Sequence, residues 1–587
     1  NFTDNGFGNE NPNSVVYTNS ELSILYSKIE FTDKEKAFAR AIFIGTSSRL
    51  SMRGNRIVNC SYRSGSGAAL YYQIVKNRES SDVSIFDNTF INNTASDIGT
   101  EMYFFINSSP DIYNCSFYNE DCKTRPIFIQ FEKEQNFTLK YDSLCFYNCN
   151  FNYNQFVPYF PTYLVSGNNE PFVYTNCEFI SCQNIPFLFD NLYPVEFEYC
   201  KFHENVNENY FINIKYVKYA SITNCEFINI TLLPNPSESY TGKVDLMMIN
   251  IYQVPLTIRN TVFQNIHFQE DNDKISNDFI FQIEGNLHMF DTSLINCSSF
   301  KNAIYFNPPI RPVYDEEQQK YLPNSFEMYN CVVDNCGLVS INDWTQQVNV
   351  CGSLFANSID GLKYTSNRPI YSYLVYDVVQ FENNVFDGFT NSACIFTVIN
   401  DIDIRNLTLR NCASLGKYCQ PIFKLDVKNK TINHFIFDQF TFENNRFNNS
   451  DDQRWMNGGG TGFVLDLAFM NEENDSKEVE LYFIDCSFTS NNAELNGGAF
   501  AFNDSFNDTK TFLNVLNCSF KDNTCNTSQG SSLCLDVRKL SVENCIFESE
   551  SNSTIYLHHF NSSLETSKEV FSFNNCSFVS SREHPIH

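Results

Sequence analysis

Cysteine is the residue type whose spacing most plainly suggests chemistry in this chain. The 587 residues include 22 cysteines, and five cysteines follow another one closely along the sequence. These candidates for local disulfides are Cys115 with Cys122, Cys177 with Cys182, Cys331 with Cys336, Cys412 with Cys419, and Cys518 with Cys525. A ladder of buried thiols is an equally good interpretation. Metal binding is less favoured because the spacings vary and no histidine recurs beside them, so no metal ligand is assigned. Sequence alone cannot give the connectivity.

Clustered carboxylates are the candidates for acid–base catalysis. Asp451 and Asp452 lie beside Arg454, Glu472 is followed by Glu473, and a third cluster covers Asp315–Glu317. Enzymes that cleave polysaccharides use a carboxylate pair, or a base beside a cation. Solvated loop charge is nevertheless the favoured interpretation of all three clusters. The Asn-Thr-Asp, His-Gly and Arg-Ile-Lys elements of pectinases are also missing.

Histidines add no support for catalysis at the level of sequence. The eight histidines show no shared register; they are His203, His267, His288, His434, His558, His559, His584 and His587. We therefore assign no catalytic residue and expect a protein that is not an enzyme. A polysaccharide lyase or hydrolase is the alternative.

Aromatic residues offer a third kind of site, a carbohydrate-binding surface. The candidates are Tyr71–Tyr72 and the stretch Tyr153–Tyr163, which includes Phe156, Tyr159 and Phe160. Burial in a core is the commoner fate of such residues.

One short stretch recurs along the chain and organises these residues. In Val515–Phe520, the apolar set changes parity at Asn517, which an unbroken strand would not allow. The chain must bend there, and Asn tolerates the left-handed conformation that such a corner needs. Eighteen corners are predicted, at Asn59, Asp87, Asn114, Asn148, Asn176, Tyr199, Asn224, Asn260, Asn296, Asn330, Gly352, Asn383, Asn411, Asn444, Asp485, Asn517, Asn544 and Asn575.

The spacing of the corners predicts the fold. Copies recur about every 30 residues, each with about three short strands and no long amphipathic helix. This pattern indicates an all-β, right-handed, single-stranded parallel β-helix of about 18 coils, of the pectin-lyase-like kind. Stacked coils would bring the corner residues into a ladder. Its predicted members are Asn114, Asn148, Asn176, Asn224, Asn260, Asn517, Asn544 and Asn575.

The ends and one insertion depart from the repeat. We expect residues 1–43 to form an N-terminal cap with a short helix near Asp33–Ala37, and residues 44–587 to form the β-helix. A long loop insertion is expected near 448–478. Nothing resembling a cap follows Phe578. We therefore expect a downstream segment or a second copy to cover the last coil, and head-to-tail copies would form a filament.

Composition limits the partners and indicates the compartment. A formal charge of −28 argues against binding nucleic acid or an anionic membrane, and no apolar run is long enough to span a bilayer. The cysteines and 19 Asn-x-Ser/Thr sequons favour a secreted or cell-surface protein carrying N-linked glycans and no other cofactor. The glycosylation candidates are Asn59, Asn92, Asn107, Asn136, Asn229, Asn406, Asn429, Asn474, Asn503, Asn526, Asn552 and Asn561.

One copy resembles a known family. The run Phe488-x-x-Asn491-x-Ala493, followed by Gly497-Gly498-Ala499-Phe500, is similar to the repeat of chlamydial polymorphic outer membrane proteins and of protist surface proteins. The resemblance implies a β-helical surface or adhesion protein. The corner Asn-Cys pair and the dense cysteines depart from the family pattern, and the composition fits a eukaryotic microbe. We expect an extracellular structural or adhesive glycoprotein that binds itself or host or matrix glycans, with a polysaccharide-active or carbohydrate-binding protein as the alternative.

Overall fold

A computed structural model describes the β-strand framework of the chain. The described residues are 2–3, 14–18, 22–30, 40–44, 49–62, 66–73, 82–95, 101–106, 110–118, 127–131, 139–149, 171–185, 187–190, 194–235, 244–269, 275–297, 302–308, 314–315, 320–321, 324–342, 345, 347–365, 378–398, 402–415, 421–427, 434–448, 463–466, 478–493, 497–503, 510–526, 530–537, 539–549, 554–557 and 570–580. Two compact units can be distinguished. Unit 1 is Asn1–Gly285 with Asn296–Ser299, and unit 2 is Asn286–Ile295 with Phe300–His587.

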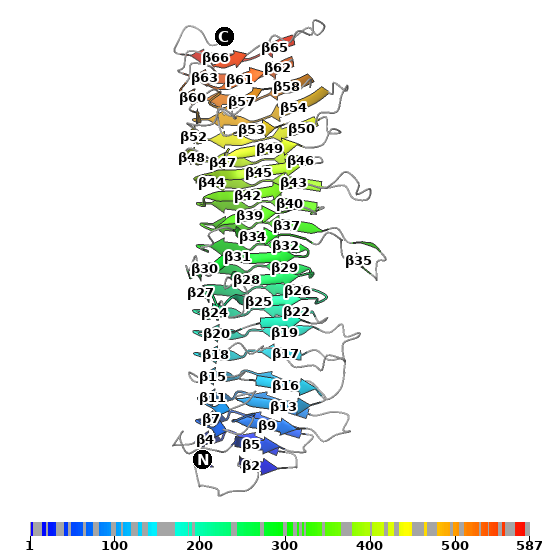
Figure 1. The fold of residues 1–587 in the computed structure, drawn as a ribbon, viewed down its shortest axis with the longest axis vertical. Coiled ribbons are helices and arrows are strands. Elements are labelled where there is room, and N and C mark those ends of the chain that lie inside the picture. Colours follow the sequence, from blue (N-terminus) through cyan, green and yellow to red (C-terminus); the bar gives the residue numbers. More distant parts are fainter. Residues whose placement is uncertain are drawn as a thin grey trace. The chain divides into compact units, whose positions relative to one another are not determined.

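Each unit is built from the same three kinds of parallel sheet (Figure 1). Sheet 1 holds the strands that lead into a first corner, sheet 2 holds the strands between this corner and a second one, and sheet 3 holds the strands of the remaining side. Strands of the three sheets pair in parallel with their equivalents in neighbouring coils, as in the register of Phe90 with Phe117. The predicted fold class, an all-β parallel β-helix, is confirmed.

The strands of unit 1 follow this order. Sheet 1 contains β3 (Leu22–Leu25), β6 (Arg49–Arg53), β10 (Asp82–Phe86), β14 (Asp111–Tyr113), β17 (Leu139–Asp142), β19 (Phe172–Thr175), β22 (Val195–Glu198), β26 (Ala220–Thr223) and β29 (Leu256–Arg259). Sheet 2 contains β1 (Phe2–Thr3), β4 (Lys28–Glu30), β7 (Arg56–Val58), β11 (Thr89–Ile91), β15 (Ser116–Tyr118), β18 (Cys145–Tyr147), β20 (Glu178–Ile180), β23 (Lys201–His203), β27 (Glu226–Leu233) and β30 (Val262–Phe268). The strand β24 (Val206–Glu208) follows the second corner Glu204 and pairs with the last residues of β27. Sheet 3 contains β2 (Ser14–Thr18), β5 (Arg40–Ile44), β9 (Leu70–Gln73), β13 (Met102–Ile106) and β16 (Ile127–Phe131), then β21 (Phe187–Asp190), β25 (Tyr210–Lys215), β28 (Val244–Tyr252) and β31 (Ile275–Glu284). The short strands β8 (Ser61–Tyr62) and β12 (Thr94–Ala95) pair beyond the second corner.

Unit 2 repeats the arrangement. Sheet 1 contains β32 (Leu287–Phe290), β37 (Ser325–Tyr329), β40 (Gln347–Cys351), β43 (Val378–Glu382), β46 (Ile402–Arg405), β50 (His434–Asp438), β54 (Glu478–Ile484), β58 (Lys510–Leu516), β62 (Lys539–Glu543) and β65 (Val570–Asn574). Sheet 2 contains β33 (Ser293–Ile295), β38 (Val332–Asp334), β41 (Leu354–Ala356), β44 (Val385–Asp387), β47 (Thr408–Arg410), β51 (Thr441–Glu443), β55 (Ser487–Thr489), β59 (Ser519–Lys521), β63 (Ile546–Ser549) and β66 (Ser577–Ser580). Sheet 3 contains β34 (Asn302–Phe306), β39 (Leu338–Ile341), β42 (Asp360–Thr365), β45 (Ser392–Val398), β49 (Phe423–Val427), β53 (Phe463–Asp466), β57 (Phe500–Asn503), β61 (Leu533–Asp536) and β64 (Ile555–Leu557). Beyond the second corner lie β48 (Ala413–Leu415), β52 (Arg446–Asn448), β56 (Asn492–Ala493) and β60 (Thr524–Cys525), while β35 (Tyr314–Asp315) and β36 (Lys320–Tyr321) form an antiparallel pair.

Columns of stacked phenylalanines form the core of each unit. In sheet 2 of unit 1, Phe90, Phe117 and Phe146 are fully buried, and their ring centroids are 5.1 and 4.8 Å apart. In unit 2, Phe520 stacks on Phe547 at 4.8 Å. These distances equal the spacing between neighbouring strands, so offset stacking extends from coil to coil without strain.

Every predicted corner lies in the left-handed region. Their φ values run from 48° at Asn260 to 65° at Gly352. Three members of the predicted ladder, Asn517, Asn544 and Asn575, are joined by amide hydrogen bonds in unit 2. The Nδ2 of Asn575 donates to Asn544 Oδ1 at 2.7 Å, and the Nδ2 of Asn544 donates to Asn517 Oδ1 at 3.2 Å. Asn148 follows a sheet 2 strand and therefore lies in a different column from Asn114 and Asn176.

Many described coils have a second such corner after the sheet 2 strand, and some have more than two, whereas the sequence analysis assigned one corner to each coil. Asp87 ends a sheet 1 strand with φ 57°, and Asn92 ends the following sheet 2 strand with φ 50°. Five predicted corners belong to the second column, because each follows a sheet 2 strand; they are Asn59, Asn148, Asn296, Asn411 and Asn444. Tyr26, Gly54, Ser143, Asp291, Asn406 and Gln439 occupy first corners that the motif did not identify.

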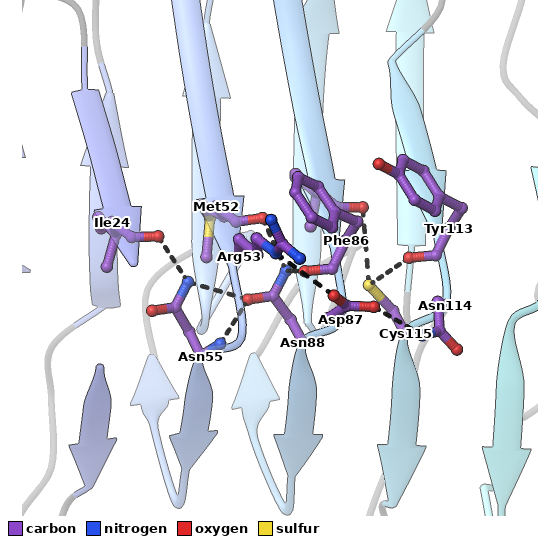
Figure 2. A network of polar contacts seen from close by, with 11 residues as sticks. Ile24, Met52, Arg53, Asn55, Phe86, Asp87, Asn88, Tyr113, Asn114 and Cys115 are labelled. Carbon is purple, nitrogen blue, oxygen red and sulfur yellow. Dashed lines mark hydrogen bonds and ion pairs between the residues drawn. The ribbon is translucent and has the colours of Figure 1, made fainter. Parts of the chain in front are cut away.

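A second, buried ladder lies one residue after the corners. Asn55 and Asn88 are 2% and 1% exposed, and the Asn55 backbone N–H and Nδ2 both donate to Asn88 Oδ1 at 2.9 Å (Figure 2). The Nδ2 of Asn88 in turn donates to the Met52 carbonyl at 3.1 Å. In the next coil the Cys115 thiol takes this place and donates to the carbonyls of Ile85 and Tyr113. Asn and Cys are therefore interchangeable here, since both satisfy carbonyls that the bend leaves unpaired.

Two predicted boundaries change. Residues 22–30 already form a regular coil: β3 and β4 pair in parallel with β6 and β7, and Tyr26 is a corner, so the repeat begins inside the predicted cap. The helix expected at Asp33–Ala37 lies outside the described residues. The predicted insertion near 448–478 contains a framework strand, β53, which pairs with β49 and is therefore not purely a loop.

The last described coil differs from the others in exposure. Phe571 and Val579 are 41% and 54% exposed, whereas Leu540 one coil earlier is 1% exposed. The expectation that another segment or copy covers this coil stays a prediction.

The corner geometry gives a stability test. Replacing Asn517 by Val should reduce the free energy of unfolding by about 1–2 kcal/mol, because a β-branched residue resists φ near 56°. Replacing Asn517 by Gly is the matched control, since it removes the same amide but accepts that φ. Urea unfolding followed by circular dichroism measures both. Equal losses for the two variants would contradict the conformational explanation.

Candidate functional site

Three of the five candidate cysteine pairs lie wholly within the described residues, and no disulfide joins the members of any of the three. These pairs are Cys177 with Cys182, Cys331 with Cys336, and Cys518 with Cys525. Cys122 and Cys419, the partners expected for Cys115 and Cys412, lie outside the described residues. Cys177 follows a first corner and Cys182 follows the second, with strand β20 between them. Three extended residues span about 10 Å, beyond the ~7 Å that a disulfide bridges between Cα atoms. The predicted local disulfide is therefore not formed between these two residues.

Burial raises the pKa of several described core thiols. It raises the pKa of Cys331 from 9.0 to about 11, and it raises the pKa of Cys115 and of Cys412 to about 12. Their sulfurs donate to strand carbonyls, as Cys331 Sγ does to Tyr329 O at 3.4 Å. These thiols act as small buried donors, which is the thiol-ladder alternative.

Three glycosylation candidates have exposed side chains. They are Asn229, Asn406 and Asn526, and the first two are left-handed corners. Asn59 and Asn92 are partly exposed. The remaining candidates, or their side chains, lie outside the described residues: Asn107, Asn136, Asn429, Asn474, Asn503, Asn552 and Asn561.

The acidic clusters and one aromatic stretch named from sequence lie largely outside the described residues. This holds for Asp451, Asp452 and Arg454, for Glu472–Glu473, and for Tyr153–Tyr163. Asp315 belongs to the β35–β36 pair, and its two acidic neighbours are not described. Within the described residues, no group of three or more His, Cys, Asp or Glu is placed to hold a metal ion. The described part of the chain also contains no helix that could cross a membrane.

The outer face of sheet 3 in unit 1 carries an aromatic column. Tyr72 points into the core, but Tyr71 points outward and stacks between Phe43 and Tyr103, with ring centroids 5.0 and 4.9 Å apart. The rings are nearly parallel, at 4° and 6°. In the backbone register, Tyr17 on β2 pairs with Phe43, and Phe128 on β16 pairs with Tyr103.

A second outward column runs beside the first. Gln73, Phe105 and Gln130 occupy one register, two residues after the aromatic column. The Tyr71 hydroxyl donates to Gln73 Oε1 at 3.4 Å. We call the two columns together the aromatic–amide face. It combines aromatic rings with the neutral Gln73 amide and the tyrosine hydroxyls.

The outer face of sheet 1 in unit 2 carries a polar cluster. His288 on β32 lies opposite Glu327 on β37, and its Nδ1 is 2.9 Å from Glu327 Oε2. Its other nitrogen, Nε2, is 3.4 Å from Ser325 Oγ. The Glu327 side chain is 17% exposed and that of His288 is 28% exposed. The hydrogen bond from His288 lowers the pKa of Glu327.

Asn349 continues this cluster on the next strand. It lies opposite Glu327, is 4% exposed, and its Oδ1 has no hydrogen-bond partner in the described structure. Gln347 on the same strand donates through Nε2 to Glu327 Oε1 at 3.4 Å.

Sequence reasoning missed this cluster because it missed a corner. His288 stands three residues before the corner Asp291, and Glu327 stands three residues before the corner Asn330. The sequence analysis placed that coil's corner at Asn296, which is the second one. Aligning on Asp291 would have placed His288 opposite Glu327.

Comparisons with known proteins add little beyond the fold. No protein-family model matches the chain, and no curated protein matches its sequence. Among solved structures, an arginine-to-alanine mutant of the PL6-family alginate lyase AlyGC is similar at 9% identity and TM-score 0.20, over 96% of this chain and 97% of its own. A match at this TM-score carries no implication for activity.

The buried thiols predict a loss of stability in alkali. A thiol with an ordinary pKa in the unfolded chain ionises near pH 9, whereas Cys331 and Cys412 stay protonated to about pH 11 and 12. The folded state therefore binds more protons above pH 9, and the free energy of unfolding falls as pH rises from there. Between pH 8 and 10 each thiol should account for about 1–2 kcal/mol of this fall.

The control replaces a thiol by a hydroxyl. Ser353 occupies the equivalent position one coil after Cys331 and donates to a carbonyl in the same way. The Cys331→Ser variant should therefore lose less stability between pH 8 and 10 than the native protein in urea titrations. Parallel curves for the two proteins would show that the thiol has no such effect.

Proposed function

We propose that this protein is an extracellular, adhesive β-helix glycoprotein that binds a neutral glycan on the aromatic–amide face of unit 1. The observation that carries the proposal is the outward stack of Phe43, Tyr71 and Tyr103 on consecutive coils. Surface aromatics presented in such a repeat offer contact area with little entropic cost on binding.

The geometry of the stack suits a sugar chain. The ring centroids are about 5 Å apart, whereas the planes of stacked rings are in contact at roughly 3.5 Å. The rings are therefore offset-stacked and overlap only in part. Each ring then leaves part of its face and edge for the C–H groups of a sugar. The Gln73 amide and the tyrosine hydroxyls beside them offer donors and acceptors for sugar hydroxyls.

Charge favours a neutral ligand over an acidic one. The chain carries a formal charge of −28, and the two columns of the face contain no ionisable group other than tyrosine. A polyanionic glycan would be repelled at low ionic strength, whereas a neutral polysaccharide would not. The repeat of the columns along successive coils, at about 4.8 Å, suits an extended polymer.

The extracellular part of the proposal draws on the sequons. Asn229 and Asn526 have exposed side chains, so a glycan added to the nascent chain could be accommodated in the fold. The acidic clusters considered for the alternative, a polysaccharide lyase or hydrolase, are those around Asp451 and Glu472, which lie outside the described residues, and Asp315–Glu317, of which only Asp315 is described.

Affinity electrophoresis tests the glycan-binding face. Gels cast with neutral polysaccharides (hydroxyethyl cellulose, galactomannan, xyloglucan and mixed-linkage glucan) should retard the protein, and gels with alginate or polygalacturonate should not. The Tyr71→Ala and Tyr103→Ala variants should bind about 10-fold more weakly, because each loses a central aromatic contact.

Tyr118 provides the matched control. It stacks on Tyr147 at 4.8 Å and is 40% exposed, but it lies on sheet 2 rather than on the aromatic–amide face. The Tyr118→Ala variant should bind like the native protein. Migration unaffected by all neutral polysaccharides, or equal losses in all three variants, would refute the proposal.

A further inference from the structure

We propose that Ser325, His288 and Glu327 form a hydrolytic triad on the outer face of sheet 1 in unit 2, acting on carboxylic esters with a short acyl group. The proposal does not rest on glycan binding, which was assigned to a different unit. It rests on the two contacts of the His288 ring, 3.4 Å from Nε2 to Ser325 Oγ and 2.9 Å from Nδ1 to Glu327 Oε2.

The two ring contacts match the division of roles in a serine nucleophile system. Glu327 accepts a hydrogen bond from His288 Nδ1–H, which leaves Nε2 as the acceptor facing the serine hydroxyl. His288 is then the general base and Glu327 orients it. The 3.4 Å contact is longer than a tight hydrogen bond, as is common for catalytic contacts before substrate binds.

The β-helix framework holds the three side chains rigidly. His288 and Glu327 are register partners on neighbouring strands, and Ser325 precedes Glu327 by two residues, on the same face of β37. Asn286 fixes the backbone of the nucleophile, because its Oδ1 accepts the Ser325 N–H at 3.1 Å. Sites on paired strands are held more precisely than sites on loops.

A comparison within unit 2 shows what distinguishes this cluster. His434 and Glu480 also pair across neighbouring strands of sheet 1, with Nδ1 and Oε2 3.0 Å apart. There the second partner of Glu480 is the Tyr482 hydroxyl at 2.7 Å, and no serine contact to His434 is found among the described residues. The His–Glu pair thus recurs, and the serine marks the proposed site.

The surroundings offer a place for the alcohol portion of an ester. Asn349 follows Glu327 along the same column and keeps a buried Oδ1 without a hydrogen-bond partner in the described structure. A buried unpaired acceptor is costly unless a ligand donor reaches it. A hydroxyl group on the substrate would supply this donor.

The reaction balances without any further reagent. Ser325 Oγ bonds to the acyl carbon as its proton passes to His288 Nε2, and the ester C–O bond breaks while the alcohol leaves with that proton. Water then adds to the acyl-serine, giving a proton to His288 Nε2, and the Oγ–carbon bond breaks as Oγ regains it. The sum is ester plus water giving carboxylic acid plus alcohol. Ser325 is 4% exposed, which favours a small acyl group such as acetyl.

A fluorophosphonate probe tests the nucleophile directly. The native protein should be labelled at Ser325, located by peptide mass spectrometry, and should hydrolyse p-nitrophenyl acetate faster than p-nitrophenyl octanoate. Ser325→Ala should abolish labelling, and His288→Gln should slow it about 100-fold or more through loss of the base. Glu327→Gln should slow acetate hydrolysis while leaving the label at Ser325.

The matched control is His434→Gln, which removes the equivalent ring from the pair without a serine. Its labelling rate and esterase activity should equal those of the native protein. Circular dichroism and thermal unfolding confirm that each variant is folded. A folded native protein that the probe leaves unlabelled at Ser325 would overturn the proposal without reference to any variant, as would a His288→Gln variant labelled at the native rate.

Discussion

The structure depends on satisfying the backbone groups that each corner leaves unpaired. A chain that bends sharply between two strands interrupts the regular ladder of peptide hydrogen bonds, and buried unpaired carbonyls are costly. The side chain of the residue after the corner points into the coil and can donate a hydrogen bond to these carbonyls. Asn88 donates to the carbonyls of Met52 and Phe86, and Cys115 donates to those of Ile85 and Tyr113. Serine does the same at Ser353.

This requirement accounts for much of the unusual composition. A short side chain with a donor follows many of the corners, although Leu144, Leu407 and Phe440 follow others. Cysteine supplies such a donor while packing like a small apolar group. Buried thiols can also accept, as Cys545 Sγ does from the Cys518 N–H at 3.3 Å. The high cysteine content is therefore explained by corner hydrogen bonding in the described coils, without disulfides.

Once the corners and the phenylalanine core are satisfied, the outward positions are free to carry function. Residues on neighbouring coils meet side by side although tens of positions separate them in sequence, as His288 and Glu327 do. The same geometry aligns Phe43, Tyr71 and Tyr103. A β-helix thus turns equivalent positions of successive repeats into continuous surface columns. The two proposed sites lie on two such columns. The aromatic–amide face of unit 1 is uncharged, and the cluster in unit 2 pairs the His288 ring with the Glu327 carboxylate.

The sequence by itself determined the repeat, the strand content and the left-handed corners, because these depend on local conformational preference and on parity. Asn, Asp and Gly accept positive φ more readily than other residues, and alternation marks a strand. Tertiary structure decided which of two corners each motif belongs to. Both corners need the same backbone conformation. Local preference therefore cannot show which of Asp291 and Asn296 is the first corner of the coil. Because of this ambiguity, the register predicted from sequence was shifted, and the prediction did not place His288 opposite Glu327. It also made Cys177 and Cys182 look like neighbours, although an extended strand separates them. Contacts between coils depend on register, and only the folded stack of strands sets the register.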